Sequence, residues 1–341
     1  MRNLRLLGLV LFVLTFANAC GGGGDQIAPT DPSTTQYLVI TIDVEAQPTR
    51  QDKDHVQRLI YGNFPGLGRA GIVDMMDIAD RHRVKLTFFL DVLEEIIYPS
   101  EIEAVAHLIV DRGHDLQLHT HPDIMPDDWW RKIGVLRKDP NKFTKADADA
   151  LFTEAKRIVS TWNIPPFIAY RAGSYRYSQG FVQAMPKAGI AFSYNYNISG
   201  VSQRKLHLKN VPMFRWEDDV VEVPISYINN GKSSPIRFDD ATYVSTQDVQ
   251  SAYQLISQFQ GQWKSPNPLV MMLHSWSLLD LNTETNFFEY KDSSRLVLFD
   301  KFLSSLPSQV QVITATKLSQ LVSHQTIPVL DRMNTADVFP K

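Results

Sequence analysis

Two histidines and an aspartate lie within five residues of one another, directly after an apolar segment. The stretch HDLQLHTHPD covers residues 114–123 and contains His119, His121 and Asp123. Imidazole and carboxylate groups are ligands that proteins offer to zinc and to other divalent transition metals. Taken alone, the stretch is either a metal site or a polar loop that carries two imidazoles.

A pair of carboxylates ends an earlier apolar run. In YLVITIDVEA, Asp43 and Glu45 are two residues apart, so both side chains point to the same side of an extended strand. Two carboxylates this close raise each other's pKa unless a cation lies between them. Glu45, His119 and either Asp123 or His121 would supply three protein ligands and leave one position open for water. Asp43 would then stay free to act as a base.

The rest of the chain alternates between strand and helix patterns. Strands are predicted at 37–43, 84–91, 115–119, 166–171, 220–226, 268–276 and 309–313. Helices are predicted at 71–82, 100–113, 144–162, 178–188, 245–260, 293–306 and 316–323. Strands that alternate with helices pair in parallel, and about seven such units predict an α/β fold, a (β/α) barrel rather than an open sheet.

Side chains capable of chemistry follow several of these predicted strands. They are Asp43, Asp91, His119, Arg171 and His274. Because the C-terminal ends of parallel strands share one face, and sites form on that face, we expect these side chains to meet in one site.

Four motifs, in order, resemble those of the polysaccharide deacetylases of carbohydrate esterase family 4, the NodB homology domain. They are TIDVE, GHDLQLHTHPD, YRAGSYR and MMLHSW, and VITATKL is similar to the final strand and helix of that family. The resemblance covers roughly residues 37–322 and implies the distorted seven-stranded parallel (β/α) barrel of the polysaccharide deacetylases.

The resemblance also implies an activity, which is the hydrolysis of linear amide bonds that removes N-acetyl groups from a cell-envelope or exported polysaccharide. It implies a divalent metal, zinc in the first place, and an N-acetylated polysaccharide as the partner. By resemblance, Asp43 is the base, Arg171 holds that base, and His274 is the acid. The metal ligands would be Glu45, His119 and Asp123, with His121 as the alternative to Asp123.

The chain departs from the family pattern in the first and third motifs. The first motif lacks adjacent aspartates, and no proline follows Arg171. We expect a backbone N–H near Ser174 or Tyr175 to contact the oxyanion. The aromatic residues near the motif loops either stack on sugar rings or pack in the core; they are Trp129, Trp130, Tyr175, Tyr177 and Trp276.

The N-terminus has the features of an export signal. Arg2 and Arg5 precede an apolar run at 6–17, which is too short to span a membrane. FANAC then resembles a bacterial lipoprotein signal, in which Cys20 is lipidated and becomes the new N-terminus. The alternative is an ordinary signal peptide that is cut near Ala19 and releases a secreted protein.

The sequence around the single cysteine favours the lipoprotein. Cys20 has no second cysteine with which to form an internal disulfide, and a Gly/Pro/Ser/Thr-rich segment follows it. We therefore expect an exported protein, anchored through Cys20 to a membrane on its periplasmic or outer-membrane face. The predicted organisation is a signal peptide at 1–19, a tether at 20–36, a deacetylase-like domain at 37–325 and a C-terminal tail at 326–341.

The overall composition narrows the class of partner. The chain has 341 residues, 44% of them hydrophobic, and a formal net charge of −3, which gives no reason to expect nucleic acid or an anionic membrane as the main partner. The composition does not predict an oligomeric state. Three other functions stay open: a non-catalytic glycan-binding lipoprotein on the same fold, another metal-dependent C–N hydrolase, and a structural lipoprotein.

Overall fold

The computed structural model describes residues 35–46, 54–197, 212–228, 234–235, 267–333 and 335–339. The predicted signal peptide, Cys20 and the predicted helix at 245–260 lie outside these residues. Within the described segments, no helix combines the length and the apolar character needed to cross a membrane.

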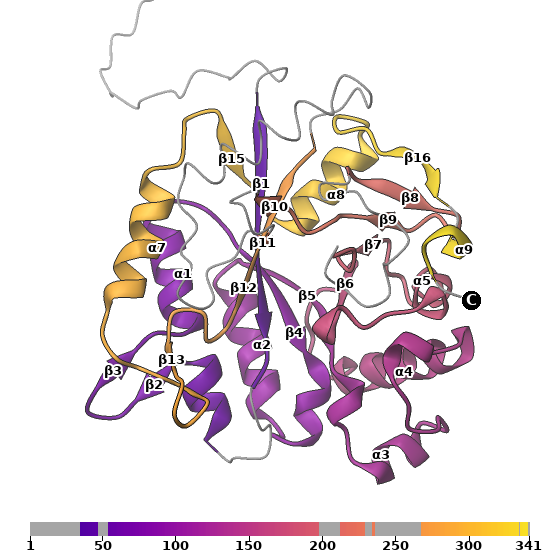
Figure 1. Cartoon of the computed structure of the whole chain (residues 1–341), viewed down its shortest axis with the longest axis horizontal. Coiled ribbons are helices and arrows are strands. Elements are labelled where there is room, and N and C mark those ends of the chain that lie inside the picture. Colours follow the sequence, from indigo (N-terminus) through magenta and orange to yellow (C-terminus); the bar gives the residue numbers. More distant parts are fainter. Residues whose placement is uncertain are drawn as a thin grey trace, which may run out of the picture.

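A curled, largely parallel sheet forms the centre of the molecule (Figure 1). Its strand order is β12-β1-β4-β5-β6-β7-β9-β8-β16, and β15 pairs with the beginning of β1. The strands of this sheet are β1 (Gln36–Val44), β4 (Thr87–Asp91), β5 (Asp115–Thr120), β6 (Ala169–Ala172), β7 (Phe192–Ser193), β8 (Phe214–Trp216), β9 (Val221–Glu222), β12 (Leu269–His274), β15 (Val310–Val312) and β16 (Leu330–Met333).

Seven of these strands curve toward a closed barrel. Each neighbouring pair from β12 to β9 is parallel. After β9, the backbone N–H of Ser226 donates to the carbonyl of Val270 in β12 at 3.2 Å, and the Val270 N–H donates to the Ser226 hydroxyl at 2.9 Å. These hydrogen bonds connect the segment after β9, the last of the seven strands, to β12, the first. The predicted α/β barrel is therefore confirmed, in a strongly distorted form.

Helices cover the outside of the curled sheet, and α1 and α7 lie side by side (Figure 1). The α-helices are α1 (Ile72–Arg81), α2 (Glu101–Asp111), α3 (Asp127–Lys132), α4 (Lys145–Val159), α5 (Gln179–Ala184), α7 (Ser294–Ser304), α8 (Ala315–Ser323) and α9 (Thr335–Val338). Short helical turns lie at Val56–Ile60, Val92–Ile96, Pro122–Ile124, Pro140–Lys142 and Gly173–Tyr175. In the part of the chain that the structure describes, three two-stranded sheets pair β2 (Asn63–Phe64) with β3 (Gly68–Arg69), β10 (Tyr227–Ile228) with β11 (Ser234–Pro235), and β13 (Asp280–Asn282) with β14 (Phe287–Glu289).

Alternation along β1 explains how an apolar strand presents a carboxylate to the barrel interior. Leu38 and Ile40 belong to the large core between sheet and helices, whereas Tyr37 and Val39 belong to a second buried cluster with Phe89. Successive side chains of a strand point to opposite faces. Continuing this alternation places Thr41, Asp43 and Glu45 on the interior side.

Most predicted strands and helices are present, with shifted ends. Strand β6 begins at Ala169 rather than at the predicted Pro166. Pro165 and Pro166 have no N–H to donate to a neighbouring strand, so the pairing begins after them. The short strand β7 was not predicted, because the two residues Phe192 and Ser193 give too little alternation to detect.

The segment predicted as a C-terminal tail contributes to the fold. Strand β16 pairs in parallel with β8, and Phe339 is buried against the rings of Trp216 and Tyr177. Ile327, Val338 and Phe339 are buried. The hydrophobic effect therefore favours packing of this segment on the barrel.

Candidate active site and metal centre

The strand register brings the predicted site residues to one level of the barrel. Asp43 on β1 is the register partner of His274 on β12, and His119 on β5 is the partner of Asp91 on β4 and of Arg171 on β6. Each of these residues lies at or near the C-terminal end of its strand. The parallel pairing therefore gathers side chains that are up to 231 positions apart in the chain (274 minus 43).

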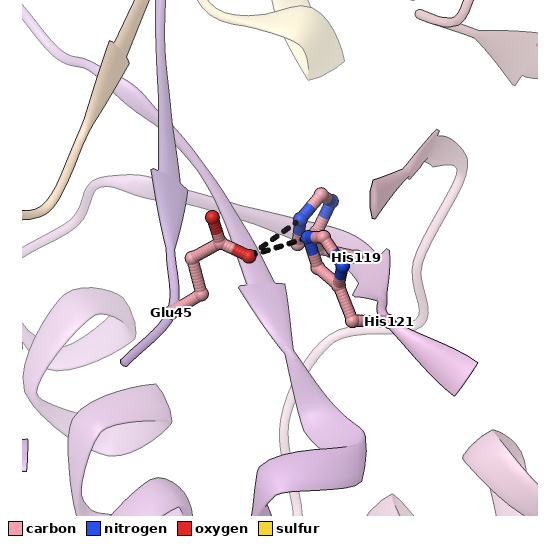
Figure 2. Close-up of side chains that lie close together, drawn as sticks. All are labelled: Glu45, His119 and His121. Atoms are coloured by element: carbon pink, nitrogen blue, oxygen red, sulfur yellow. Dashed lines mark ion pairs between the residues drawn. The ribbon is translucent and has the colours of Figure 1, made fainter. Parts of the chain in front are cut away.

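Glu45, His119 and His121 form a compact buried group that could hold a metal ion (Figure 2). Glu45 Oε2 lies 2.6 Å from His121 Nε2 and 3.4 Å from His119 Nε2, and one ligand atom from each residue lies within 4.8 Å of the others. The three side chains are almost completely buried. Two imidazoles and one carboxylate are a donor set that suits zinc in a catalytic site.

One imidazole nitrogen of this group fits metal binding particularly well. His119 Nε2 is buried and has no hydrogen-bond partner within the described residues. The other ring nitrogen, Nδ1, lies 2.8 Å from the backbone carbonyl of Arg171. If the ring hydrogen of His119 is on Nδ1 and is donated to this carbonyl, the lone pair of Nε2 is directed at Glu45. A histidine that binds a metal through Nε2 needs this tautomer.

Asp123 lies behind His121 and outside this three-residue group. Its Oδ1 is 3.4 Å from His121 Nδ1, and its Oδ2 accepts a hydrogen bond from Arg176 Nη1 at 3.2 Å. Burial raises the pKa of the Asp123 carboxyl, but the hydrogen bond and charge of His121 and the charge of Arg176 outweigh burial. The pKa of Asp123 is therefore below its usual value. Of the two alternatives for the third ligand, the geometry favours His121.

Arg171 holds Asp43 at the base of the site. Its Nη1 donates to Asp43 Oδ1 at 2.6 Å, and its Nη2 donates to the Thr41 hydroxyl at 2.8 Å. The guanidinium is fully buried and stacks over the Phe89 ring at 4.4 Å. Burial alone would lower the pKa of Arg171, but the charge and hydrogen bond of Asp43 raise it, so Arg171 keeps its positive charge. Arg171 therefore fixes the position of the Asp43 side chain, which is the contact that the family resemblance implies between these two residues.

His274 borders the site from β12 and is the least buried of the three histidines. Its side chain is 17% exposed, and its Nε2 is 3.8 Å from Glu45 Oε1. The ring stacks on Trp276 with a centroid distance of 4.5 Å, and the backbone N–H of His274 donates to the Ser277 hydroxyl. Ring stacking and the backbone contact hold an imidazole that is still accessible to solvent.

The loop after β6 closes the site over His121. A Cβ atom at Gly173 would lie 2.3 Å from the His121 ring, so only glycine allows this approach. Ser174 and Tyr175 both have positive φ angles, of 51° and 53°. Ser174 is exposed, and the Tyr175 hydroxyl donates to the Met272 sulfur at 2.7 Å. The backbone predicted to contact an oxyanion therefore lies beside a proposed metal ligand, in a conformation that L-residues seldom adopt.

Most of the aromatic residues near the motifs pack in the interior. Four of them are less than 4% exposed, and these are Trp129, Trp130, Tyr177 and Trp276. A buried ring cannot stack on a sugar, so the packing alternative holds for these four. Trp276 still contributes to the site indirectly, because its ring stacks on the His274 ring.

Several residues of the site were not identified from the sequence. Thr41 follows the same alternation as Asp43, and that pattern could have revealed it. Arg176 belongs to the YRAGSYR motif but has no spacing signal of its own. Asn195, whose Oδ1 accepts a hydrogen bond from the Ala172 N–H at 2.6 Å, lies in a segment without a recognisable motif.

Comparison with solved structures identifies the fold. A protein from Mycobacterium smegmatis, provisionally described as a polysaccharide deacetylase, superposes with a TM-score of 0.51 over 86% of this chain and 92% of its own. The chain has the polysaccharide deacetylase fold. At 13% identity the superposition establishes the fold alone, so any activity has to follow from the site.

Two further structures are similar to this deacetylase fold at lower scores. A CE4 family pseudoenzyme from Bacillus anthracis has 12% identity and a TM-score of 0.43, over 84% of this chain and 66% of its own. A family 4 carbohydrate esterase from Streptomyces lividans in complex with acetate has 10% identity and a TM-score of 0.40, over 87% and 98%. The sequence matches no protein-family profile and no curated protein sequence.

Proposed function

We propose that the protein is a divalent-metal-dependent hydrolase that removes N-acetyl groups from a cell-envelope or exported polysaccharide. The observation that carries the proposal is the buried group of Glu45, His119 and His121, with Asp43 and His274 beside it at the ends of paired strands. The deacetylase fold supports the substrate class, and the donor set supports the metal.

Glu45, His119 and His121 would hold the metal through one carboxylate oxygen and two Nε2 atoms. When bound, a divalent ion of this kind polarises a carbonyl oxygen and lowers the pKa of a coordinated water. Zinc is the first candidate, because the ligands are two imidazoles and one carboxylate.

Asp43 would act as the general base. Its carboxyl group accepts a proton from the water that attacks the acetyl carbonyl carbon, and Arg171 holds that group in place through the hydrogen bond at 2.6 Å. Arg171 itself contacts no substrate atom in this proposal, so it is a positioning residue.

His274 would act as the general acid. The amide C–N bond breaks, acetate leaves with the oxygen of the water, and the protonated His274 ring donates a proton to the sugar amine. Backbone N–H groups of Ser174 or Tyr175 are the groups we propose for the negative oxygen that forms during attack. Trp276 holds the His274 ring from one side by stacking.

Acetate release measures this activity directly. The purified chain should release acetate from at least one member of a panel of N-acetylated glycans, with a mass loss of one acetyl group per event. A chelator should abolish the release, and zinc or cobalt should restore it. Bound metal without acetate release would contradict the enzyme, whereas glycan binding without metal would favour the non-catalytic glycan-binding protein.

Export and anchoring through Cys20 are a separate proposal, supported by the sequence alone. Mass spectrometry of the mature N-terminus would show a lipidated Cys20 if the proposal is right. Cleavage near Ala19 with an unmodified cysteine would contradict the anchor and favour the secreted form.

A further inference from the structure

His121 precedes the position at which the family resemblance expects the third metal ligand. His119 and His121 are two residues apart, whereas the resemblance places a ligand four residues after His119, at Asp123. The structure directs the two residues differently. His121 Nε2 is 2.6 Å from Glu45 Oε2, and Asp123 Oδ1 is 3.4 Å from the other ring nitrogen, Nδ1.

The two nitrogens of an imidazole point away from each other, and this separates Asp123 from the metal position. An ion shared by Glu45 and His121 Nε2 would have the His121 ring between itself and the Asp123 carboxylate. A carboxylate behind a ligand histidine accepts the Nδ1 hydrogen, fixes the tautomer and orients the ring. His119 is oriented in the same way, but by the backbone carbonyl of Arg171.

Arg176 completes the arrangement on the second oxygen of Asp123. Its Nη1 donates to Asp123 Oδ2 at 3.2 Å, which turns Oδ1 toward the His121 ring. The backbone N–H of Arg176 donates to the Gly173 carbonyl at 3.0 Å, across the two left-handed residues Ser174 and Tyr175. One short loop thus places Gly173 against the ring and Arg176 against the carboxylate.

We propose that Asp123 and Arg176 are positioning residues that orient His121 and thereby set the metal affinity of the site. The inference rests on the proposed function, because it concerns the same metal group. It assigns position 123 an orienting role in this chain, although the family resemblance makes that position a ligand. The chain then binds its metal through Glu45, His119 and His121 alone.

The test measures metal affinity, which needs no substrate. The variants are Asp123→Asn, Arg176→Gln, the double variant and His121→Ala, in the full chain. Zinc affinity is measured by competition with a chromogenic chelator, and the ligand environment by the visible absorption of bound cobalt. Arg137→Gln is the matched control, because Arg137 donates to the backbone carbonyl of Asp123 and to Asp127 but not to the Asp123 carboxylate.

The expected results separate orienting residues from ligands. Asp123→Asn should weaken zinc binding by about 10- to 100-fold and Arg176→Gln by up to about 10-fold. The double variant should bind about as weakly as Asp123→Asn, since Arg176 acts through Asp123. The cobalt spectrum should keep its shape in these variants and change in His121→Ala. The control should match the wild type, and thermal unfolding confirms that each variant is folded.

Two outcomes would overturn the inference. One is wild-type affinity in Asp123→Asn, and the other is a changed cobalt spectrum in Asp123→Asn together with an unchanged one in His121→Ala, because Asp123 would then be the ligand. A wild-type chain that binds no zinc would overturn both this inference and the proposed function. Metal binding without acetate release from any glycan would overturn the function alone and leave the affinity test valid.

Discussion

Arg171 uses each nitrogen of its guanidinium group on a different partner. Nη1 donates to Asp43, Nη2 to Thr41, and Nε to the Tyr194 carbonyl at 3.3 Å, while the Phe89 ring covers one face. A lysine would bring the same charge but could not make this planar set of contacts. The residue type at this position therefore follows from geometry as much as from charge.

The two proposed proton-transfer residues can be tested individually. Asp43→Asn and His274→Gln should each lower kcat for acetate release by about 10²-fold or more, because each variant removes one proton transfer. The side chains remain close in size, so zinc affinity should change little. Steady-state kinetics and chelator competition measure the two quantities.

His324→Gln is the matched control for His274, since His324 is exposed at the end of α8. This variant should keep wild-type kcat. Full activity in Asp43→Asn would contradict the assignment of the base.

The loop that follows β6 shows how one element packs against His121, the proposed third ligand. The Ala172 N–H donates to Asn195, and a proline at that position would have no N–H for this bond. Gly173 has no side chain because the His121 ring occupies that space. The hydrogen bond of Ala172 therefore gives a structural reason for the absence of a proline directly after Arg171.

Gly173→Ala tests this contact at the level of the loop. The new methyl group would lie 2.3 Å from the His121 ring, so the ring must move. We expect zinc affinity to fall by about 10-fold or more, with a loss of stability of about 1–3 kcal/mol. Chelator competition and chemical denaturation measure the two effects.

Gly134→Ala is the control for backbone conformation. Gly134 has a φ of +72°, and a Cβ atom there meets open space. This variant should lose about 1–2 kcal/mol from left-handed strain and keep its zinc affinity. Equal zinc affinity in both variants would contradict the role of Gly173.

At the scale of the whole molecule, a buried glutamate joins the end of β7 to the β8–β9 hairpin. The Glu222 carboxyl group accepts hydrogen bonds from the backbone N–H groups of Asn195 and Tyr196, at 2.8 and 2.7 Å. It also accepts one from the indole N–H of Trp216 at 2.9 Å. Burial raises the pKa of Glu222 to about 7, although these donors and Ser193 oppose the rise. Its protonation is thus coupled to folding near neutral pH.

The sign of this coupling gives a pH prediction. Between the unfolded pKa near 4.5 and the folded pKa near 7, the native state binds more protons than the unfolded state. Stability from Glu222 is therefore complete below pH 4.5 and is lost as the pH rises through 7. The loss from about pH 5 to about pH 8 should be roughly 2 kcal/mol.

Denaturation at several pH values across this range checks the prediction by comparing wild type with Glu222→Gln. The variant cannot titrate at this position, so its stability should fall less than that of the wild type as the pH rises. Parallel curves for the two proteins would contradict the raised pKa.

Local patterns were sufficient to predict the barrel and most of the candidate site residues. Apolar runs such as LVMML predict buried strands, and the residues just after them lie at the strand ends that share one face. Asp43, Glu45, His119, Arg171 and His274 could therefore be assigned to one site from the sequence alone. The two-residue strand β7 and the packing of Phe339 could not be predicted, since their signals are too short or depend on distant partners.

The sequence by itself determined the alternation of strands and helices, the side of each strand on which a residue lies, and the residue types available for chemistry. Only the tertiary structure distinguishes which residue, His121 or Asp123, completes the candidate metal group. His121 and Asp123 both follow His119 closely along the chain, and both offer a suitable ligand atom. The choice depends on Gly173, Arg176 and Glu45, which reach His121 and Asp123 from other parts of the barrel through register and loop conformation. Such contacts leave no periodic signal in the sequence, because they join residues whose separation along the chain is set by unrelated helices and loops.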